Sequence, residues 1–122
     1  MNNHDLRERP ATARRKEKLL AEICAYVDTH LEEGTSLRSV ASYFQVSIST
    51  VTQLFQHKSD KTFHQYLTQR RMVVAAERIA KGVPLEEVGK QVGYADHSSF
   101  YRAFKLYYGV SPREYRRRQT KE

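Results

Sequence analysis

LRSVASYFQVSISTVTQLF, residues 37–55, and LEEVGKQVGYADHSSFYRAF, residues 85–104, are two copies of one pattern that begin 48 positions apart. Each copy reads as a helix, a tight turn and a second helix. The apolar positions match in order: Leu37, Val40, Ala41, Phe44, Val46, Val51 and Phe55 correspond to Leu85, Val88, Gly89, Val92, Tyr94, Phe100 and Phe104, with one extra residue in the second turn. A small residue, Ala41 or Gly89, allows the two helices of each copy to cross closely. The pattern predicts a duplicated helix-turn-helix.

The rest of the chain also reads as helices, so we expect an all-α fold of about seven helices. Residues 1–15 are charged and lack apolar periodicity, which predicts a disordered tail or linker. The first helix is expected to begin near Lys16 and to end at Gly34 in a left-handed cap. The predicted organisation is an N-terminal helix-turn-helix subdomain at 16–61, a linker helix at 62–82 and a C-terminal helix-turn-helix subdomain at 83–119.

Capping residues mark the ends of the other expected helices. The predicted N-caps are Ser36, Ser47 and Asp96, the predicted capping boxes are Thr62 with Gln65 and Ser111 with Glu114, and Pro84 is expected in the first turn of the fifth helix. Gly82 is expected to close the linker helix.

The charge balance favours a polyanionic partner. The chain has 21 Lys and Arg against 14 acidic residues, a net charge of +7 and a pI near 9.7. A basic surface alone also suits a ribosomal protein or an anionic membrane. The single cysteine, Cys24, excludes an internal disulfide, fits a reducing compartment and is expected to be a buried apolar residue. There is no apolar run of about 18 residues and no signal peptide, so we expect a cytoplasmic protein without a membrane partner.

The length of the linker helix suits two helix-turn-helix units that contact DNA one helical turn apart. From Thr62 to Lys81 it has 20 residues, and at a rise of 1.5 Å per residue it is about 30 Å long. Successive major grooves on one face of B-DNA are separated by about 34 Å. We therefore expect the second helices of the two copies to enter adjacent major grooves, so that a monomer is sufficient to bind double-stranded DNA.

The polar residues of these two second helices are the candidates for contacts with bases. The base-reading set is Ser49, Thr50, Thr52 and Gln53 in the first copy and His97, Ser98, Ser99 and Arg102 in the second. Gln53 matches the hydrogen-bonding edge of adenine, and Arg102 matches that of guanine. The candidates for phosphate contacts are Ser36, Lys61, Thr62, Lys105 and Arg113, chosen for their charge or their place at a helix N-terminus. For any single polar residue, a solvated helix position is the competing interpretation.

Two further groups of arginines leave alternatives open. Arg70, Arg71 and Arg78 on the linker helix either contact phosphates or brace the two subdomains through carboxylates such as Glu77 or Glu87. Residues 116–118 are three consecutive arginines, which predict a solvated helix end that adds nonspecific attraction.

Two stretches also carry a family resemblance. VGYADHSSFYRAFKLYYGVSPREYRR, residues 92–117, combines an aromatic after glycine, the paired phenylalanines, a lysine and a Gly-Val-Ser-Pro turn, and RRMVVAAERIA, residues 70–80, forms the linker helix. In these features, residues from about 18 to 118 resemble the DNA-binding domain of AraC/XylS-type bacterial transcription regulators. The resemblance implies seven helices, two helix-turn-helix subdomains and asymmetric promoter sites. In many members it also implies activation through contacts with RNA polymerase.

Three positions depart from the usual family pattern. Gln53 stands where the third helix often carries arginine, which weakens the expectation of a guanine contact there. Asp60 replaces a common glycine and predicts a less regular end of that helix. Gly89 replaces alanine, at a cost of about 1 kcal/mol in helix propensity. The polar start of the chain favours a C-terminal portion of a longer regulator over a small free-standing one.

Two other classes of function are the alternatives. An enzyme is disfavoured, because the five histidines lack metal-ligand spacing and no HExxH, CxxC, phosphate loop or nucleophile elbow occurs. We therefore expect no catalytic residues, no metal and no cofactor. The main rival is a basic helical protein-interaction module that docks on RNA polymerase or another partner without reading bases.

Overall fold

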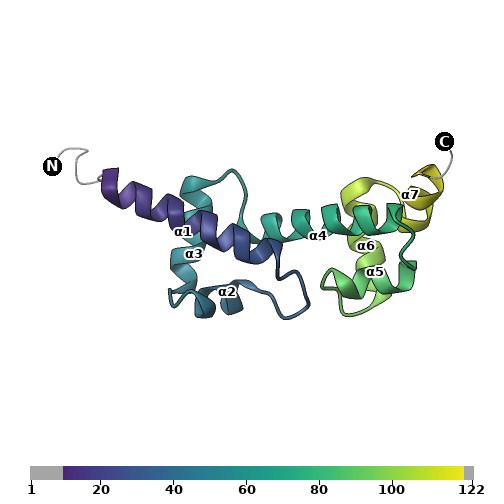
Figure 1. Cartoon of the computed structure of the whole chain (residues 1–122), viewed down its shortest axis with the longest axis horizontal. Coiled ribbons are helices and arrows are strands. Elements are labelled where there is room, and N and C mark those ends of the chain that lie inside the picture. The colour runs from purple at the N-terminus through teal and green to yellow at the C-terminus, as the bar shows by residue number, and fades with distance from the viewer. Residues whose placement is uncertain (1–9, 120–122) are drawn as a thin grey trace.

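The computed structural model describes residues 10–119, which form seven α-helices and contain no strand (Figure 1). The helices are α1 (Pro10–Asp28), α2 (Leu37–Tyr43), α3 (Ile48–Lys58), α4 (Phe63–Ala80), α5 (Leu85–Gln91), α6 (His97–Tyr108) and α7 (Pro112–Gln119). The pairs α2–α3 and α5–α6 coincide with the two sequence copies. The expected all-α fold with two helix-turn-helix units is therefore confirmed.

Two hydrophobic cores lie at the two ends of α4. The first joins α1, α2, α3 and the start of α4, and its fully buried side chains include Ile23, Val27, Val51 and Phe55. The second joins α5, α6 and the later part of α4, and its fully buried side chains include Met72, Ile79, Phe100 and Phe104. Val74, in the middle of α4, packs against both cores. One helix thus forms a wall of both subdomains.

The turns of the two helix-turn-helix units have the same backbone geometry. A backbone N–H after each turn donates to a carbonyl in the preceding helix, Val46 to Ala41 over 3.0 Å and Tyr94 to Gly89 over 2.8 Å. Between them, Gln45 has a φ of 58° and Gly93 a φ of 103°. A left-handed residue with this bonding is the usual Schellman ending of a helix. The repeat in sequence therefore corresponds to a repeat in backbone conformation.

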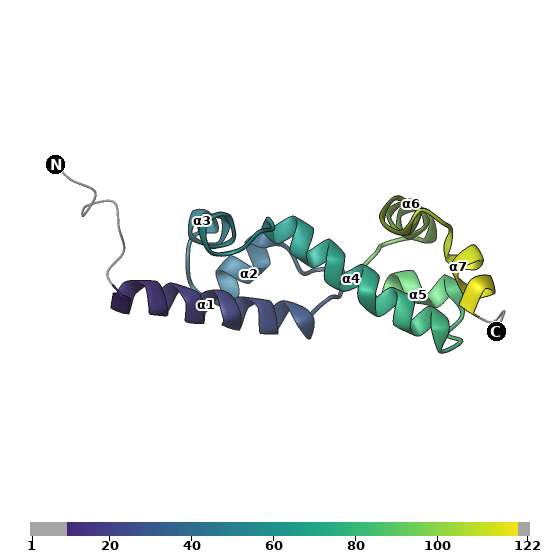
Figure 2. The same ribbon diagram turned by 90° about the horizontal axis from the view of Figure 1, so that it is seen from above.

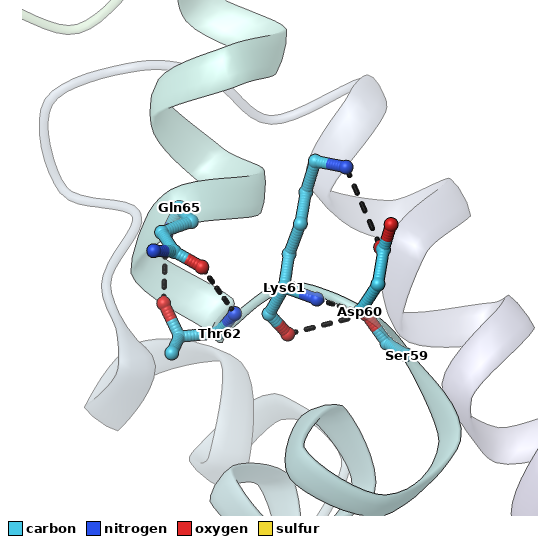
Figure 3. Close-up of polar contacts among 5 residues, drawn as sticks. All are labelled: Ser59, Asp60, Lys61, Thr62 and Gln65. Atoms are coloured by element: carbon cyan, nitrogen blue, oxygen red, sulfur yellow. Dashed lines mark hydrogen bonds and ion pairs between the residues drawn. The ribbon is translucent and has the colours of Figure 1, made fainter.

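Side-chain caps begin the helices where the sequence predicts them. Ser36, Ser47, Asp96 and Ser111 accept hydrogen bonds from the backbone amides of Ser39, Thr50, Ser99 and Glu114. At the start of α4, Thr62 accepts from the Gln65 amide over 3.1 Å, and the Gln65 side chain accepts from the Thr62 amide over 2.9 Å (Figure 3). This capping box is confirmed. At Ser111 only half of the box forms, because the Glu114 carboxylate pairs with Arg117 and Arg118 instead.

Two glycine and proline signals near α4 and α5 are also in place. Gly82 follows α4 with a φ of 93°, as expected of a residue that closes a helix. Pro84 is the N-cap of α5, which begins one residue later at Leu85.

The start of α1 differs from the expectation. The helix begins at Pro10 rather than near Lys16, so residues 10–15 do not form a disordered tail. Proline suits the first position of a helix, and the alanines and arginines that follow have high helix propensity. These residues carry no apolar periodicity, and periodicity was the basis of the prediction. The first part of the predicted tail, residues 1–9, lies outside the described residues.

The end of α1 was also predicted wrongly. The helix ends at Asp28, well before Gly34, and the φ of Gly34 is not positive. Instead, Thr29 Oγ1 donates to the Tyr26 carbonyl over 3.2 Å, and His30 Nδ1 lies 2.8 Å from the same oxygen. Polar side chains therefore satisfy the last turn, where a glycine cap had been expected.

The end of α3 has no left-handed residue. Its C-cap, Ser59, is extended, and the Ser59 hydroxyl accepts from the Lys61 amide over 3.0 Å (Figure 3). The side chain thus shapes the turn that leads to α4, which agrees with the irregular end expected from Asp60.

The crossing of α5 and α6 is closest at Gly89. A Cβ atom at this position would lie 2.8 Å from Cβ and 2.9 Å from Cγ of Phe100, whose side chain is fully buried. The equivalent residue of the first unit is Ala41, which is 3% exposed. Glycine at this position therefore leaves room for the buried Phe100 ring, whose packing offsets the unfavourable helix propensity of glycine.

We expect Gly89→Ala to destabilise the protein by about 1–2 kcal/mol, because overpacking against Phe100 outweighs the gain in helix propensity. Urea denaturation measures the change. Gly34→Ala is the matched control, since a Cβ there meets nothing within 4 Å, and it should be neutral or stabilising by up to about 1 kcal/mol. Equal stability of the two variants would show that Phe100 does not limit the crossing.

Candidate nucleic-acid interface

The two recognition helices, α3 and α6, lie on the same long side of the molecule. Figure 2 shows both of them nearly end-on, on the side opposite α1, so their axes are roughly parallel. In Figure 1 the same two helices run across the long axis, one at each end of α4. Two helices placed in this way can approach one extended ligand together.

Most of the predicted base-reading residues are exposed on these two helices. The exposed members are Ser49 and Gln53 on α3 and His97, Ser98 and Arg102 on α6. Thr50, Thr52 and Ser99 are partly buried. The Thr50 and Ser99 amides donate to the N-cap side chains Ser47 and Asp96, so both residues belong to the caps. Five of the eight candidates are therefore exposed to solvent, and the other three are partly buried.

A groove beside α3 brings together predicted residues from three elements. Ser36 at the start of α2, Thr52 on α3 and Thr62 at the start of α4 all line it. Gln56 also lines this groove and is exposed, but it was not among the predicted residues. Its spacing of four from Thr52, which places both on one helix face, was the signal that could have identified it.

A second groove lies beside the start of α6. His97 and Arg113, both predicted to contact DNA, line it together with Tyr101 and Arg116. The first turn of α5, from Pro84 to Glu86, forms the opposite wall. Tyr101 is 39% exposed and lies one turn after His97, so it belongs to the same surface although it was left out of the base-reading set.

The other flank of α3 faces α1. Thr50 and Gln53 line a groove there with His57, Lys58 and Lys16. Lys16 comes from α1, so a helix outside the two repeated units adds a basic residue beside a recognition helix. This contact joins residues far apart in the chain, and helical periodicity carries no signal for it.

The recognition helices themselves carry no carboxylate. Asp96 caps α6 and accepts from the Ser99 amide over 2.7 Å, and hydrogen bonding to Ser99 holds the pKa of this carboxyl below its usual range. Its charge lies at the positive end of the α6 dipole, which compensates it locally. Lys61 Nζ lies 3.4 Å from Asp60 Oδ1, whereas Lys105 and Arg113 are exposed. The surface around α3 and α6 is therefore suited to an anionic ligand.

The arginines of α4 bond to groups of the protein, but Arg70 and Arg78 each bond within one subdomain, so of the three it is Arg71 that braces the two subdomains. Arg70 Nε lies 3.0 Å from Asp28 Oδ1, at ion-pair distance but without hydrogen-bond geometry. Arg71 donates to the carbonyls of Leu31 and Glu32, and Arg78 donates to the side chain of Gln91. The partners of these arginines seen within residues 10–119 are thus an aspartate, backbone carbonyls and an amide, in place of the expected Glu77 or Glu87.

The expected solvated end of the chain was wrong for Arg116. Its Nε donates to the Ile79 carbonyl over 3.2 Å, and its terminal nitrogen donates to the carbonyls of Ile79 and Val83. Ile79 lies in the last turn of α4, where carbonyls lack partners within the helix. Arg117 and Arg118 instead pair with the Glu114 carboxylate, which lowers the pKa of Glu114.

Residues 10–119 were expected to contain neither a metal site nor a membrane span. No group of three or more His, Cys, Asp or Glu residues there is arranged to hold a metal ion. None of the helices in this range has both the length and the apolar character needed to cross a bilayer.

Comparison with known proteins identifies close counterparts. A family model described as a helix-turn-helix domain matches residues 40–118. LumQ of Photobacterium leiognathi, described as a probable transcriptional regulator, is 33% identical over 91 residues, which cover 74% of this chain and 37% of LumQ. The chain thus spans about a third of the length of that curated relative.

Solved structures have the same architecture. The C-terminal domain of AraT, a response regulator from Geobacillus stearothermophilus, superposes with a TM-score of 0.77 at 32% identity, covering 81% of this chain and 84% of that one. The DNA-binding domain of AdpA, a global transcriptional factor solved in complex with a target DNA, superposes with a TM-score of 0.75 at 24% identity, covering 81% and 90%. The second likeness shows a shared fold.

We expect Arg116→Ala to lower the free energy of unfolding by about 1–3 kcal/mol, because it removes the donors that this side chain supplies to the Ile79 and Val83 carbonyls and leaves the Ile79 carbonyl with backbone amide donors, such as that of Gly82. Arg118→Ala is the matched control, since it removes one exposed ion pair and should change stability by less than about 1 kcal/mol. Urea denaturation of the two variants tests this contrast. Equal effects would mean that Arg116 does not cap α4.

Proposed function

The chain belongs to the AraC/XylS-type helix-turn-helix family, and on that premise we propose that it regulates transcription by binding a specific double-stranded DNA site with α3 and α6 in adjacent major grooves. The observation that carries the proposal is the placement of two roughly parallel recognition helices, with exposed polar side chains, on one side of the molecule (Figure 2). The complex of AdpA with its target DNA supports it by analogy of fold. LumQ, AraT and AdpA are described as a probable transcriptional regulator, a response regulator and a transcriptional factor, and we assign no catalytic role.

The dimensions of the structure fit such a complex. An α-helix with its side chains is about 10–12 Å wide, and the major groove of B-DNA is about 12 Å wide. Helix α4 has 18 residues, which corresponds to about 27 Å, and one subdomain packs toward each of its ends. This is the scale of one turn of B-DNA, about 34 Å. A monomer of this chain is therefore sufficient for two groove contacts in our proposal.

The exposed side chains divide into two roles. Gln53 on α3 is proposed to pair with adenine and Arg102 on α6 with guanine, because their paired donors and acceptors match those base edges. Ser49 and Ser98 have short side chains, so they allow the helix backbone to approach the bases, and His97 is proposed as a further base contact. Thr50, Thr52 and Ser99 are also proposed to contact bases, at the edges of the interface between these helices and DNA.

The proposed phosphate contacts surround these helices. Lys105 and Arg113 are exposed cations on and beside α6, and Lys61 precedes α4. Ser36 and Thr62 lie at helix starts that share a groove with Thr52, where the partial positive charge of a helix end attracts phosphate. Such contacts fix the register of the protein on DNA and carry no sequence information themselves.

We also propose that the protein acts in the bacterial cytoplasm, where the chromosome is accessible, and that RNA polymerase is a further partner, as the family membership implies. The rival interpretation, a module that docks on a protein without reading bases, does not account for two parallel polar helices on one side. It predicts partner binding without a preferred DNA sequence.

Affinity for DNA should fall steeply with salt. If Lys61, Lys105 and Arg113 each neutralise one phosphate, the slope of log K against log salt is expected to be about −3 or steeper, because counterions are released on binding. The probe is a duplex selected from a random pool with this chain, and fluorescence anisotropy at several salt concentrations measures the slope. A flat slope, or a pool that yields no enriched sequence, would favour the protein-docking interpretation.

Arg102→Ala and Lys105→Ala should separate base readout from phosphate binding. Loss of Arg102 is expected to cost about 1–3 kcal/mol and to relax the preference at one base pair. Loss of Lys105 should weaken binding to all duplexes about equally and reduce the salt slope by about 1. Titration of both variants against the selected duplex and its single-base variants measures the difference. Uniform weakening by Arg102→Ala would contradict the base-reading role of Arg102.

A further inference from the structure

The two subdomains meet at a second place besides α4. The loop between α1 and α2 belongs to the first subdomain, and the turn between α5 and α6 belongs to the second. Arg71, on α4, lies between them. Its Nε donates to the Leu31 carbonyl and its terminal nitrogen to the Glu32 carbonyl, each over 3.0 Å. On the other side, its guanidinium carbon lies 5.6 Å from the centre of the Tyr94 ring.

The turn also touches the loop directly at Gly93. A Cβ atom there would lie 2.1 Å from the Leu31 carbonyl oxygen and 2.6 Å from two nitrogens of Arg71. The equivalent position in the first helix-turn-helix is Gln45, which also has a positive φ and whose side chain is exposed. The turn itself therefore accepts a side chain, whereas the close approach of the Leu31 carbonyl leaves no room for one at Gly93.

This contact adds a constraint that α4 alone does not provide. The main helix packing divides into α1 to α3 with α4 and α5 to α7 with α4 in the described part of the chain. A single helix can bend and twist, so a joint made of one helix allows the two subdomains to rock. A second attachment beside the helix removes that freedom. Arg71 suits this role because its planar, multi-donor head can bond two carbonyls while its face contacts an aromatic ring.

The environment of Arg71 is that of a brace. The side chain is half-buried, and burial lowers the pKa of its guanidinium while the nearby Tyr94 and Glu32 raise it. Its hydrogen bonds go to backbone oxygens, so they hold the backbone of the loop between α1 and α2 in place. Moving the first subdomain relative to the second would break these bonds or the ring contact.

We propose that Arg71, together with Gly93 and Tyr94, locks the two recognition helices in one relative orientation and thereby sets the spacing between the two half-sites that the protein accepts. Arg71 is a positioning residue in this proposal, since it acts through α3 and α6. The part of the proposal that concerns half-sites rests on the proposed function. The lock itself is a statement about the free protein.

Arg70 provides a matched control. It is the preceding residue on α4, is half-buried like Arg71, and pairs with Asp28 of α1. The carboxylate that it pairs with thus lies in the first subdomain. Arg70→Ala removes the same charge and a comparable side chain without touching the contact with the second subdomain.

The first test uses the protein without DNA. Nitroxide labels are attached through Ser42→Cys on α2 and Lys90→Cys on α5, two exposed positions, in a Cys24→Ser background, and pulsed electron spin resonance measures the distribution of distances between them. The reference protein and its Arg70→Ala variant should give one narrow distribution, and Arg71→Ala a broader one. An equally narrow distribution for Arg71→Ala would overturn the lock.

The second test measures spacing. The probes are the two half-sites selected by the original chain, rebuilt with one base pair added or removed between them, and a duplex that holds a single half-site. If the binding-competent arrangement of Arg71→Ala falls to about a tenth of the population, its affinity for the correctly spaced duplex falls about tenfold. The variant should also discriminate less between spacings, with unchanged affinity for the single half-site. Arg70→Ala should behave as the original chain does.

The outcomes separate the two proposals. If no duplex is enriched by the original chain, the proposed function fails, and the label distances still decide whether Arg71 locks the subdomains. If Arg71→Ala retains the original preference for one spacing, the role in spacing is overturned. Circular dichroism checks that each variant is folded. Should Arg71→Ala unfold, Arg71→Lys replaces it, because lysine keeps the charge but cannot span both carbonyls and the ring, and the same broadening is expected.

Discussion

Helix α4 supplies a wall to two cores, and the places of the other helices depend on that shared burial. Phe63 and Leu67 are buried in the first core, and Met72, Ala75 and Ile79 in the second. With 3.6 residues per turn, these two apolar stripes lie roughly 130° apart around the axis of α4. The two subdomains therefore pack on different sides of the helix, one toward each end (Figure 2). An inserted residue between the stripes would turn one subdomain by about 100° relative to the other.

The angle between the two apolar stripes sets the average orientation of one subdomain relative to the other. Binding also depends on how far the subdomains move away from that average orientation. A protein that grips two grooves must hold both helices in place at once, and any rocking that is lost on binding lowers the affinity. Val74 joins the two cores through apolar contact, and Arg71 joins the two subdomains through hydrogen bonds beside α4. Together they allow a chain with two small cores to present its recognition helices as one body.

The features that the sequence predicted well are local ones. A cap such as Asp96, a box such as Thr62 with Gln65 and the repeated apolar positions all act within a few residues, so their patterns are visible along the chain. The ends of α1 were mispredicted because the propensity of residues 10–15 and the side-chain caps at Thr29 and His30 have no apolar period. The partners of Arg71 and Arg116 were not predictable, because backbone carbonyls contributed by distant segments carry no residue-specific signal. For the interface, the outward faces of α3 and α6 followed from periodicity, whereas Gln56 required the groove beside α3.

The arginines show why net charge is a poor guide to where DNA is contacted. The excess of +7 suggests a polyanion, yet Arg70, Arg71, Arg78 and Arg116 all bond to groups of the protein itself. Their charge still contributes to long-range attraction, since a hydrogen bond to a carbonyl does not neutralise a guanidinium. Their side chains, however, are held by the fold and are not aimed at a ligand. Cations that approach phosphates must come from positions that remain exposed to solvent, and beside α3 and α6 these include Lys16, Lys105 and Arg113.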